Sequence, residues 1–226
     1  MKIIAKAIWL GMLLTALAAP SANAIPLFFD DFTTGPSASW GNESGNWTAL
    51  AGVYYAQNPS NFPNARSLVA GLALTDFSVD VDVNSGADGG IWLRAANTST
   101  SVGATGVLLV WAHGNIYWHV VTSGGYGSSL SLASFAAGNF SLHVDVQGNV
   151  FSAFVNGSAT PITTLTSSTF TSGQAGLYDN NANQTFDNFQ ISAVPLPAAL
   201  PLFASGAGLL GFFGWRRKRK MAKAAA

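Results

Sequence analysis

Cysteine is absent from this 226-residue sequence, and positive charge is scarce in its central part. Without cysteine the chain has no disulfide, no thiolate metal ligand and no cysteine nucleophile. Between residues 25 and 193, Arg66 and Arg94 are the only basic residues, against all ten acidic residues, so this segment carries a formal charge of about −8. That charge argues against nucleic acid and anionic membrane surfaces as partners, and it favours cations.

The first 24 residues have the pattern of an export signal. Lys2 and Lys6 precede the apolar stretch 7–19, and Ala22-Asn23-Ala24 offers small residues at both positions of a cleavage site. This order is typical of a secretory signal peptide, here residues 1–24, which signal peptidase removes. The apolar stretch is too short for a retained membrane anchor.

The last 33 residues, 194–226, combine three different features in a fixed order. Val194-Pro195-Leu196-Pro197-Ala198 leads into an uncharged apolar run that ends at Trp215. At about 1.5 Å per residue, a helix over 198–215 is about 27 Å long, which is close to the thickness of a bilayer core. A basic tail over 216–223 follows and is expected to stay in the cytoplasm. The tail begins with Arg216, Arg217, Lys218, Arg219 and Lys220.

These three parts together resemble the PEP-CTERM sorting signal, in its Val-Pro-Leu-Pro-Ala variant. Leu196 stands where the namesake pattern has glutamate. The resemblance implies that an exosortase, a membrane protease, processes the tail of a protein held first in the inner membrane. It also implies a bacterium that makes exopolysaccharide, and a final place at the cell surface or in the extracellular matrix. The alternative is a permanent membrane anchor.

The segment between the two ends is predicted to form β-strands. Apolar and polar residues alternate over 77–83 and again over 140–146, which is the pattern of strands with one buried face. Further strands are predicted near 52–57, 67–73, 90–95, 107–111, 116–121, 129–133, 150–155, 162–166, 174–179 and 184–192. Hairpin turns are predicted at 113–115 and 147–149, and a further turn at 156–157, because Gly and Asn tolerate positive φ. So many short strands indicate an antiparallel β-sandwich.

Several short motifs narrow this fold prediction. They include Phe29-Asp30-Asp31-Phe32 near the start, Gly89-Gly90-Ile91-Trp92 in the middle, and Phe186-Asp187-Asn188-Phe189 near the end. In this order they resemble the concanavalin A-like, laminin G-like jelly rolls, including bacterial domains related to the family-16 glycoside hydrolases. The resemblance implies that the first and last strands are neighbours in one sheet.

Catalysis is not expected of this domain. A glycosidase needs two carboxylates around the scissile bond, and the family-16 pattern Glu-x-Asp-x-x-Glu is missing, since Glu43 is the only glutamate. Asp80 and Asp82 share one face of a predicted strand, but paired exposed aspartates are common on sheets. We therefore expect a non-catalytic, exported surface protein that binds glycan, with exopolysaccharide as the candidate ligand. The alternatives are a glycan-active enzyme on the same fold and a purely structural or adhesive protein.

Two groups of residues are candidate binding sites. Asp30 and Asp31 are expected to open the first strand, and Asp187 and Asn188 to lie in the last, so their oxygens are a candidate Ca²⁺ site if these strands are neighbours. The alternative is that these acids only solvate a sheet edge. Tyr117 and His119 share the strand face opposite Trp118, and Tyr126 lies in the glycine-rich loop 123–128. These three are the candidate sugar-stacking residues, whereas Trp118 is expected in the core.

We predict that the mature surface form begins at Ile25 and lacks the segment that follows Ala198, because both ends carry processing signals. Mass spectrometry of the protein in the surface fraction measures this directly. A surface form that retains Trp215 and the basic residues after it would show that the tail is a permanent membrane anchor and not a processed sorting signal.

Overall fold

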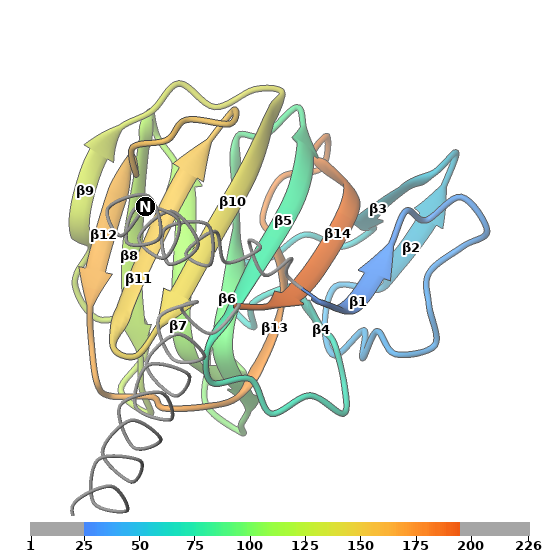
Figure 1. Cartoon of the computed structure of the whole chain (residues 1–226). Coiled ribbons are helices and arrows are strands. Elements are labelled where there is room, and N and C mark those ends of the chain that lie inside the picture. The colour runs from blue at the N-terminus through green and yellow to red at the C-terminus, as the bar shows by residue number, and fades with distance from the viewer. Residues whose placement is uncertain (1–24, 195–226) are drawn as a thin grey trace, which may run out of the picture. The chain divides into compact units, whose positions relative to one another are not determined.

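The computed structural model describes residues 25–194, which form two antiparallel β-sheets packed face to face (Figure 1). The predicted all-β sandwich is therefore confirmed. The helices predicted for the signal peptide and for 198–215 lie outside the described residues, as do the basic tail and the sorting motif after Val194. Within residues 25–194, no helix is long and apolar enough to cross a membrane.

The larger sheet has eight strands and the smaller sheet has six. In the larger sheet the order is β12-β11-β10-β5-β14-β3-β2, and β1 also pairs with β14. Its strands are β1 (Ile25–Asp30), β2 (Trp47–Leu50), β3 (Val53–Ala56), β5 (Phe77–Asn84), β10 (Phe140–Gln147), β11 (Val150–Val155), β12 (Thr163–Thr166) and β14 (Thr185–Ala193). In the smaller sheet the order is β4-β13-β6-β7-β8-β9. Its strands are β4 (Arg66–Leu68), β6 (Asp88–Asn97), β7 (Ala104–Ala112), β8 (Asn115–Val121), β9 (Leu130–Ser134) and β13 (Gln174–Asp179).

The alternating segments form strands with one buried face, as predicted, and these strands are central in the larger sheet. Leu142 on β10 pairs with Val81 on β5, and both are 2% exposed. Phe77 and Val144 are fully buried as well. Because paired residues share a face of the sheet, these side chains all point into the space between the two sheets.

Each of the five tryptophans within residues 25–194 is buried, and each indole N–H has an acceptor. A buried indole without a partner would leave a polar group desolvated, so these bonds also fix the ring orientations. The pairs are Trp40 with Asp30, Trp47 with the Ser44 carbonyl, Trp92 with Asn64, Trp111 with Gln184, and Trp118 with Thr163. The prediction that Trp118 belongs to the core is confirmed, and any stacking surface in this part must use other rings.

The predicted hairpin at 113–115 and the predicted turn at 156–157 are confirmed. His113 and Gly114 join β7 to β8 at φ values of 52° and 76°, and Asn156 and Gly157 begin the connection from β11 to β12 at 52° and 70°. In the β7–β8 hairpin, positive φ at both central residues matches the right-handed twist of the flanking strands. The turn near 147–149 is also present, between β10 and β11.

The sequence prediction was wrong at the first strand and missed the second. Asp30 ends β1 instead of opening it, because its carboxylate accepts N–H groups from Phe32 at 2.9 Å and from Ser37 at 2.7 Å, which turns the chain. The missed strand, β2, is only four residues long, and Trp47 is its one buried residue. Too few positions are available there for an alternation to be recognised.

Both basic side chains of residues 25–194 are used inside the fold. Arg94 is 3% exposed and donates to the carbonyl oxygens of Thr75, Phe170 and Gly148, the last at 2.7 Å, so that it ties three loops together. Arg66 is 6% exposed and donates to the Asn97 side chain at 2.9 Å. The exposed surface of this part of the chain is therefore rich in acids and poor in cations.

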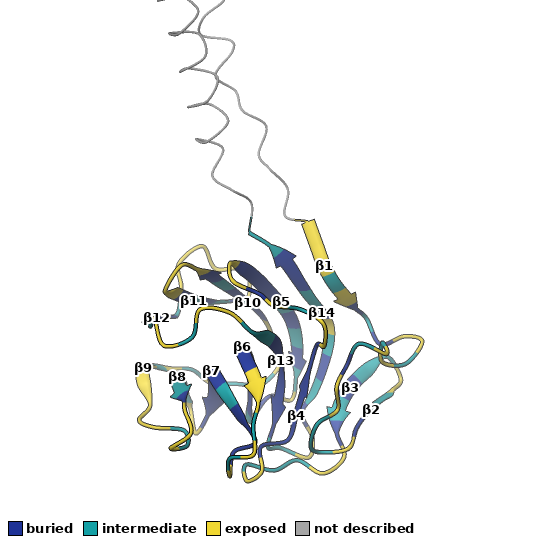
Figure 2. Ribbon diagram, turned by 90° about the horizontal axis from the view of Figure 1, so that it is seen from below, coloured by how far each residue is buried: buried dark blue, intermediate teal, exposed yellow. Residues whose placement is uncertain are grey.

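The smaller sheet is buried on both faces over much of its area. Strand β7 contains the apolar run 107–112, and nearly every residue of the strand is buried, as the dark blue in Figure 2 shows. The inner face belongs to the main core, whereas Leu68, Trp92, Leu108, Val110 and Tyr178 form a second hydrophobic cluster on the outer face. Loops pack over this second cluster and leave part of the face open.

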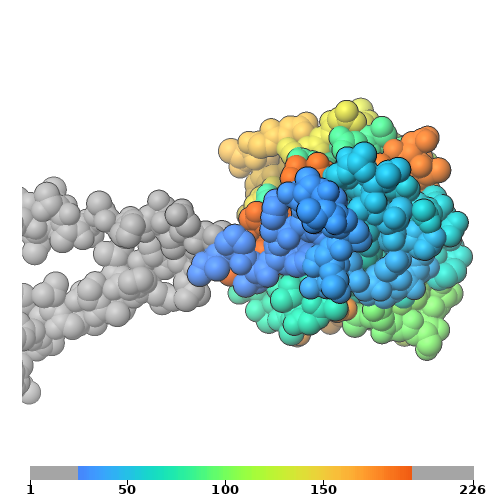
Figure 3. All heavy atoms as spheres, turned by 90° about the vertical axis from the view of Figure 1, so that its right-hand side faces the viewer, coloured from blue at the N-terminus to red at the C-terminus, as the bar shows by residue number. Residues whose placement is uncertain are grey.

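The two ends of the described chain lie side by side. Ile25 on β1 pairs with Ala193 on β14, and Figure 3 shows the blue N-terminal strand beside the orange-red C-terminal strand. The connections 85–87 and 180–184 lie at the opposite end of the sandwich, where β5 and β13 end and β6 and β14 begin. Residues at the start of β6 and the end of β13 are thus far from the chain ends along the strands.

Candidate functional site

A hollow of about 190 Å³ lies on the outer face of the smaller sheet. Its floor includes Val110 and Ala112 of β7. Tyr117 pairs with Val110 across the sheet, so its side chain stands on this outer face and not in the core. The polar lining consists of Asn61, Asp88, His113, Tyr117, His119, Tyr126 and Tyr178. We call this hollow the tyrosine pocket.

The structure brings the three predicted stacking residues together in this pocket. The ring centroids of Tyr117 and His119 are 5.3 Å apart, with the planes at 85°. His119 and Tyr126 are also 5.3 Å apart, at 52°. Tyr117 and His119 come from β8, whereas Tyr126 comes from the loop that follows it, which closes through a bridge between Thr122 and Gly125.

Hydrogen bonds beneath the pocket hold its rings in place. The Tyr126 hydroxyl donates to the Asn61 carbonyl at 3.0 Å and accepts from the Asn64 amide at 2.8 Å. The Tyr178 hydroxyl donates to the Asn61 side-chain oxygen at 3.2 Å. Because each hydroxyl has a partner, neither ring can turn without breaking a bond in a partly buried place. At the rim, Phe62 is 60% exposed and packs edge-to-face on Tyr126 at 5.4 Å.

Asp88 gives the pocket its charge. Its Oδ2 accepts a hydrogen bond from the Asn180 amide at 2.8 Å. No other side chain within residues 25–194 donates a hydrogen bond to this carboxylate. Burial, and next the negative charge of Asp88, raise the pKa values of Tyr117 and Tyr178. Burial raises the pKa of Tyr126 to about 12, with Asp88 acting in the same direction. One carboxylate therefore faces three neutral phenols.

His119 is the second titratable group of interest in the pocket. Burial lowers its pKa, against the opposing effect of the Ser128 and Tyr126 carbonyls, so the ring is neutral at pH 7. Its Nδ1 atom is buried and has no hydrogen-bond partner among the described residues. An unpaired buried nitrogen is costly unless a ligand or a water molecule reaches it.

Sequence reasoning missed Asp88, Asn61, Tyr178 and Phe62. One signal was available: the run 107–112 does not alternate, which indicates a strand buried on both faces and hence a second cluster with its own covering loops. That signal does not identify the neighbours. Asp88 and Tyr178 reach the pocket only because β6 and β13 follow β7 in the sheet order.

The candidate calcium site is not formed by the four residues proposed for it. As expected, β1 and β14 are neighbours. However, Asp30 pairs with the core residue Phe189, so its carboxylate lies on the inner side, where it also accepts the Trp40 indole N–H at 2.9 Å. Asp187 instead pairs with Asp82 on the outer side, and a bulge follows it before Gln190.

The remaining two residues of that set have other partners. Asp31 accepts both the side-chain and the backbone donors of Thr33, and these bonds lower its pKa. Asn188 turns its amide nitrogen toward Asp82, at 2.9 Å, and so acts as a donor. Over residues 25–194, no group of three or more His, Asp or Glu side chains is arranged to hold a metal ion.

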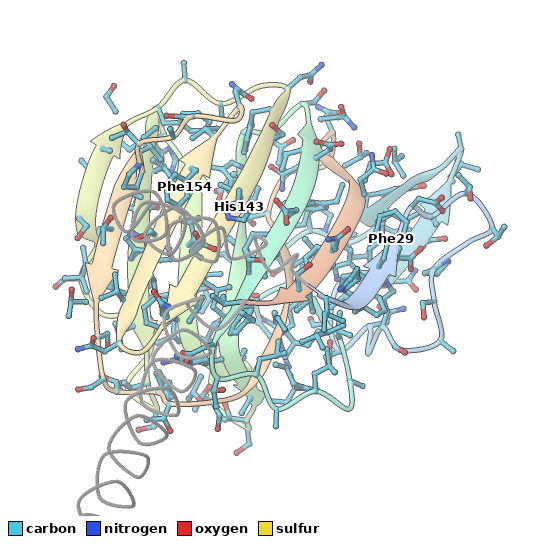
Figure 4. The ribbon with its side chains drawn as sticks, in the orientation of Figure 1. Phe29, His143 and Phe154 are labelled. Atoms are coloured by element: carbon cyan, nitrogen blue, oxygen red, sulfur yellow. The ribbon has the colours of Figure 1, made fainter. Side chains whose placement is uncertain are left out.

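A separate ionic cluster lies on the outer face of the larger sheet. His143 of β10 stands between Asp80 and Asp145, with Nδ1 at 2.7 Å from one carboxylate and Nε2 at 3.1 Å from the other. Figure 4 shows His143 beside Phe154 of β11, with Phe29 further across the same sheet on β1. The bonds to Asp145 and Asp80 raise the pKa of His143 to about 10. The imidazolium is therefore permanent at neutral pH, and this cluster stabilises the sheet.

The chain matches no family model and no curated protein sequence. It does resemble solved structures. The carbohydrate-binding module CBM66 from Bacillus subtilis is 17% identical, with a TM-score of 0.58 over 69% of this chain and 96% of that one. The exoplasmic/lumenal domain of VIP36, in a form bound to Ca²⁺ and Man3GlcNAc, is 8% identical, with a TM-score of 0.59 over 78% and 92%.

An enzyme is also among the similar structures. A putative glycosyl hydrolase from Parabacteroides distasonis is 14% identical, with a TM-score of 0.51 over 74% of this chain and 91% of that one. At these identities the likeness shows the fold alone. The fold is thus a jelly-roll β-sandwich, which this chain shares with that carbohydrate-binding module, the VIP36 domain and the putative glycosyl hydrolase.

We predict that His143 makes the stability of the domain depend on pH. Its folded pKa, about 10, lies above the ordinary value of 6.5, so its contribution is complete below about pH 6.5 and is lost as the pH rises toward 10. Urea unfolding at pH 6, 8 and 10 should show a larger loss for the wild type than for His143→Gln. Equal losses in the two proteins, or a His143 ring titration by NMR with its midpoint near 6.5, would contradict this assignment.

Proposed function

We propose that this protein is an exported, non-catalytic glycan-binding protein of the cell envelope, and that the tyrosine pocket is its binding site. The observation that carries the proposal is the convergence of Tyr117, His119 and Tyr126 on one hollow beside Asp88. Aromatic faces supply apolar contact area, and the groups between them supply directed hydrogen bonds, which is the composition expected of a small-ligand site.

The size of the pocket supports binding of one ring at a time. Its volume, about 190 Å³, lies below the range of roughly 300–1,000 Å³ that is usual for drug-sized ligands. A single sugar unit, or the end of a glycan chain, fits such a space better than a buried oligosaccharide. The exposed Phe62 ring at the rim offers a further contact for the next unit.

The carboxylates of the pocket argue against hydrolysis. Glycosidases use two carboxyl groups, about 5–9.5 Å apart, on either side of the scissile bond. Of the residues that line the tyrosine pocket, Asp88 alone carries a carboxylate. Asp179, at the end of β13, is fully buried and accepts N–H groups from Ala56, Asn181 and Gln184. We therefore keep a glycan-active enzyme on this fold as the alternative function, behind glycan binding without catalysis.

Export and sorting complete the proposed function. Signal peptidase acts after Ala24 and an exosortase acts on the tail that begins at Val194, which takes the protein from the inner membrane to the surface or the exopolysaccharide matrix. Within the described domain, Asp88, Ala112 and His113 lie toward the end of the sandwich opposite Ile25 and Val194.

Binding to a glycan array, followed by calorimetry, tests the proposal on the full chain in detergent. Tyr117→Ala should weaken binding at least tenfold, which corresponds to about 1.4 kcal/mol, because it removes one wall of the pocket. Tyr55→Ala, on β3 of the other sheet, is the matched control and should bind like the wild type.

Three outcomes would contradict the proposal. Failure of every glycan to bind would leave a structural or adhesive protein. Equal binding by Tyr117→Ala and the wild type would move the site elsewhere. Release of reducing sugar from a bound glycan would make the protein an enzyme.

A further inference from the structure

Asp88 supplies the one carboxylate among the residues that line the tyrosine pocket, and burial lowers the pKa of His119, which disfavours its charged form. The two arginines of residues 25–194 are buried and bonded to other groups, so neither offers a free guanidinium to a ligand. A ligand that enters the pocket therefore meets a carboxylate without an arginine or lysine among the lining residues.

The rings next to Asp88 act in the same direction as its charge. The face of an aromatic ring is negative, and a cation within about 6 Å of a ring centroid is attracted to it. Asp88 and the rings of Tyr117, Tyr126 and Tyr178 line the same hollow, and the charge of Asp88 acts on all three phenols. An ammonium group bound in this hollow would lie among aromatic rings and one carboxylate.

Asp88 also has bonding capacity left for such a group. Asn180 donates to Oδ2, and no other side-chain donor reaches the carboxylate within the described part of the chain. A charged group with an open acceptor favours a charged donor, because a charge-assisted hydrogen bond is roughly twice as strong as a neutral one.

We infer that the tyrosine pocket selects an amino sugar, and that Asp88 binds its protonated amino group. This inference rests on the proposed glycan-binding function and specifies its ligand class: a polysaccharide whose hexosamine units carry free, not acetylated, amines. Uronic acids and sulfated sugars are rejected, because their charge would meet Asp88 without a cation to offset it.

An amino sugar fits these observations better than a lysine side chain does. A lysine ammonium would satisfy Asp88, but its thin alkyl stem would leave much of the ring surface uncovered. A sugar ring presents a broad C–H face as well as the amine, and it can contact Tyr117 in the pocket. Phe62, which is 60% exposed and packs on Tyr126, offers further apolar surface nearby.

Calorimetry on the full chain in detergent tests the inference with five tetrameric probes. Four are β-1,4-linked glucosamine, N-acetylglucosamine, glucose and, as an α-1,4-linked acid, galacturonic acid; the fifth is tetralysine. We expect glucosamine tetramer to bind at least tenfold more tightly than the acetylated and neutral tetramers, and galacturonate not to bind. The preference should shrink as salt is raised, since screening weakens charge pairing.

The variant Asp88→Asn tests whether Asp88 causes the preference for the glucosamine tetramer. This variant should bind the glucosamine and glucose tetramers with similar affinity, whereas Asp187→Asn should keep the wild-type preference, because it removes the same charge from the outer face of the larger sheet. Thermal melts of both variants verify that they fold. If Asp88→Asn does not fold, the comparison of probes on the unchanged protein still decides the inference.

The possible failures are distinguishable. If the acetylated, neutral or acidic tetramer binds as tightly as glucosamine tetramer, the amino-sugar inference is overturned while glycan binding stands. Tighter binding of tetralysine, or an unchanged preference in Asp88→Asn, overturns it as well. If no sugar tetramer and no arrayed glycan binds, the proposed function itself fails.

Discussion

The smaller sheet has to be covered on both faces, and the candidate site follows from that requirement. The apolar run 107–112 places Val107, Leu109 and Trp111 toward the main core and Leu108 and Val110 on the outside. Exposing the second set to water would forfeit the hydrophobic stabilisation that holds most of the fold together. Loops from the neighbouring strands cover it, and the tyrosine pocket is the part of this covering that stays open.

Polar contacts help to hold the covering loops in place. Asn64 accepts the Trp92 indole N–H at 3.0 Å and donates to the Tyr126 hydroxyl, so a buried strand residue and a loop residue share one amide. Asn61 joins Tyr126 and Tyr178 in the same way. The rings that a ligand would contact are thus positioned before it arrives, which lowers the entropic cost of binding.

The scarcity of positive charge connects the fold to the ligand. In many proteins, surface lysines would neutralise part of an acidic surface. Here lysine is absent from residues 25–193, and Arg66 and Arg94 serve as internal donors for loop carbonyl and amide oxygens. Asp88 lines the pocket together with three tyrosines, and no arginine or lysine is among the lining residues. A cationic group on the proposed ligand would form a charge-assisted hydrogen bond with this carboxylate.

Much of the fold could be predicted from the sequence because the alternation is local. The faces of 77–83 and 140–146 follow from parity alone, and so does the shared outer face of Tyr117 and His119. Positive-φ residues likewise marked the hairpin turns. These features need no knowledge of which strand lies beside which.

The rest depended on strand order and register, which the sequence does not encode locally. Asp88 and Tyr178 join the pocket through the order β13-β6-β7-β8. The calcium hypothesis correctly made β1 and β14 neighbours but could not foresee the bulge between Asp187 and Gln190, where Asn188 has a φ of 49°. A bulge of this kind shifts the strand parity and separates Asp187 from Asp30 on opposite faces.

Glycan is proposed to bind on the outer face of the smaller sheet. Titration of glucosamine tetramer into isotope-labelled protein, followed by amide and aromatic chemical shifts, locates the contact directly. We expect the largest shift changes on Tyr117, His119, Tyr126 and Asp88, with little change on the larger sheet. Changes centred on His143 and Phe154, which lie on the outer face of the larger sheet, would contradict it.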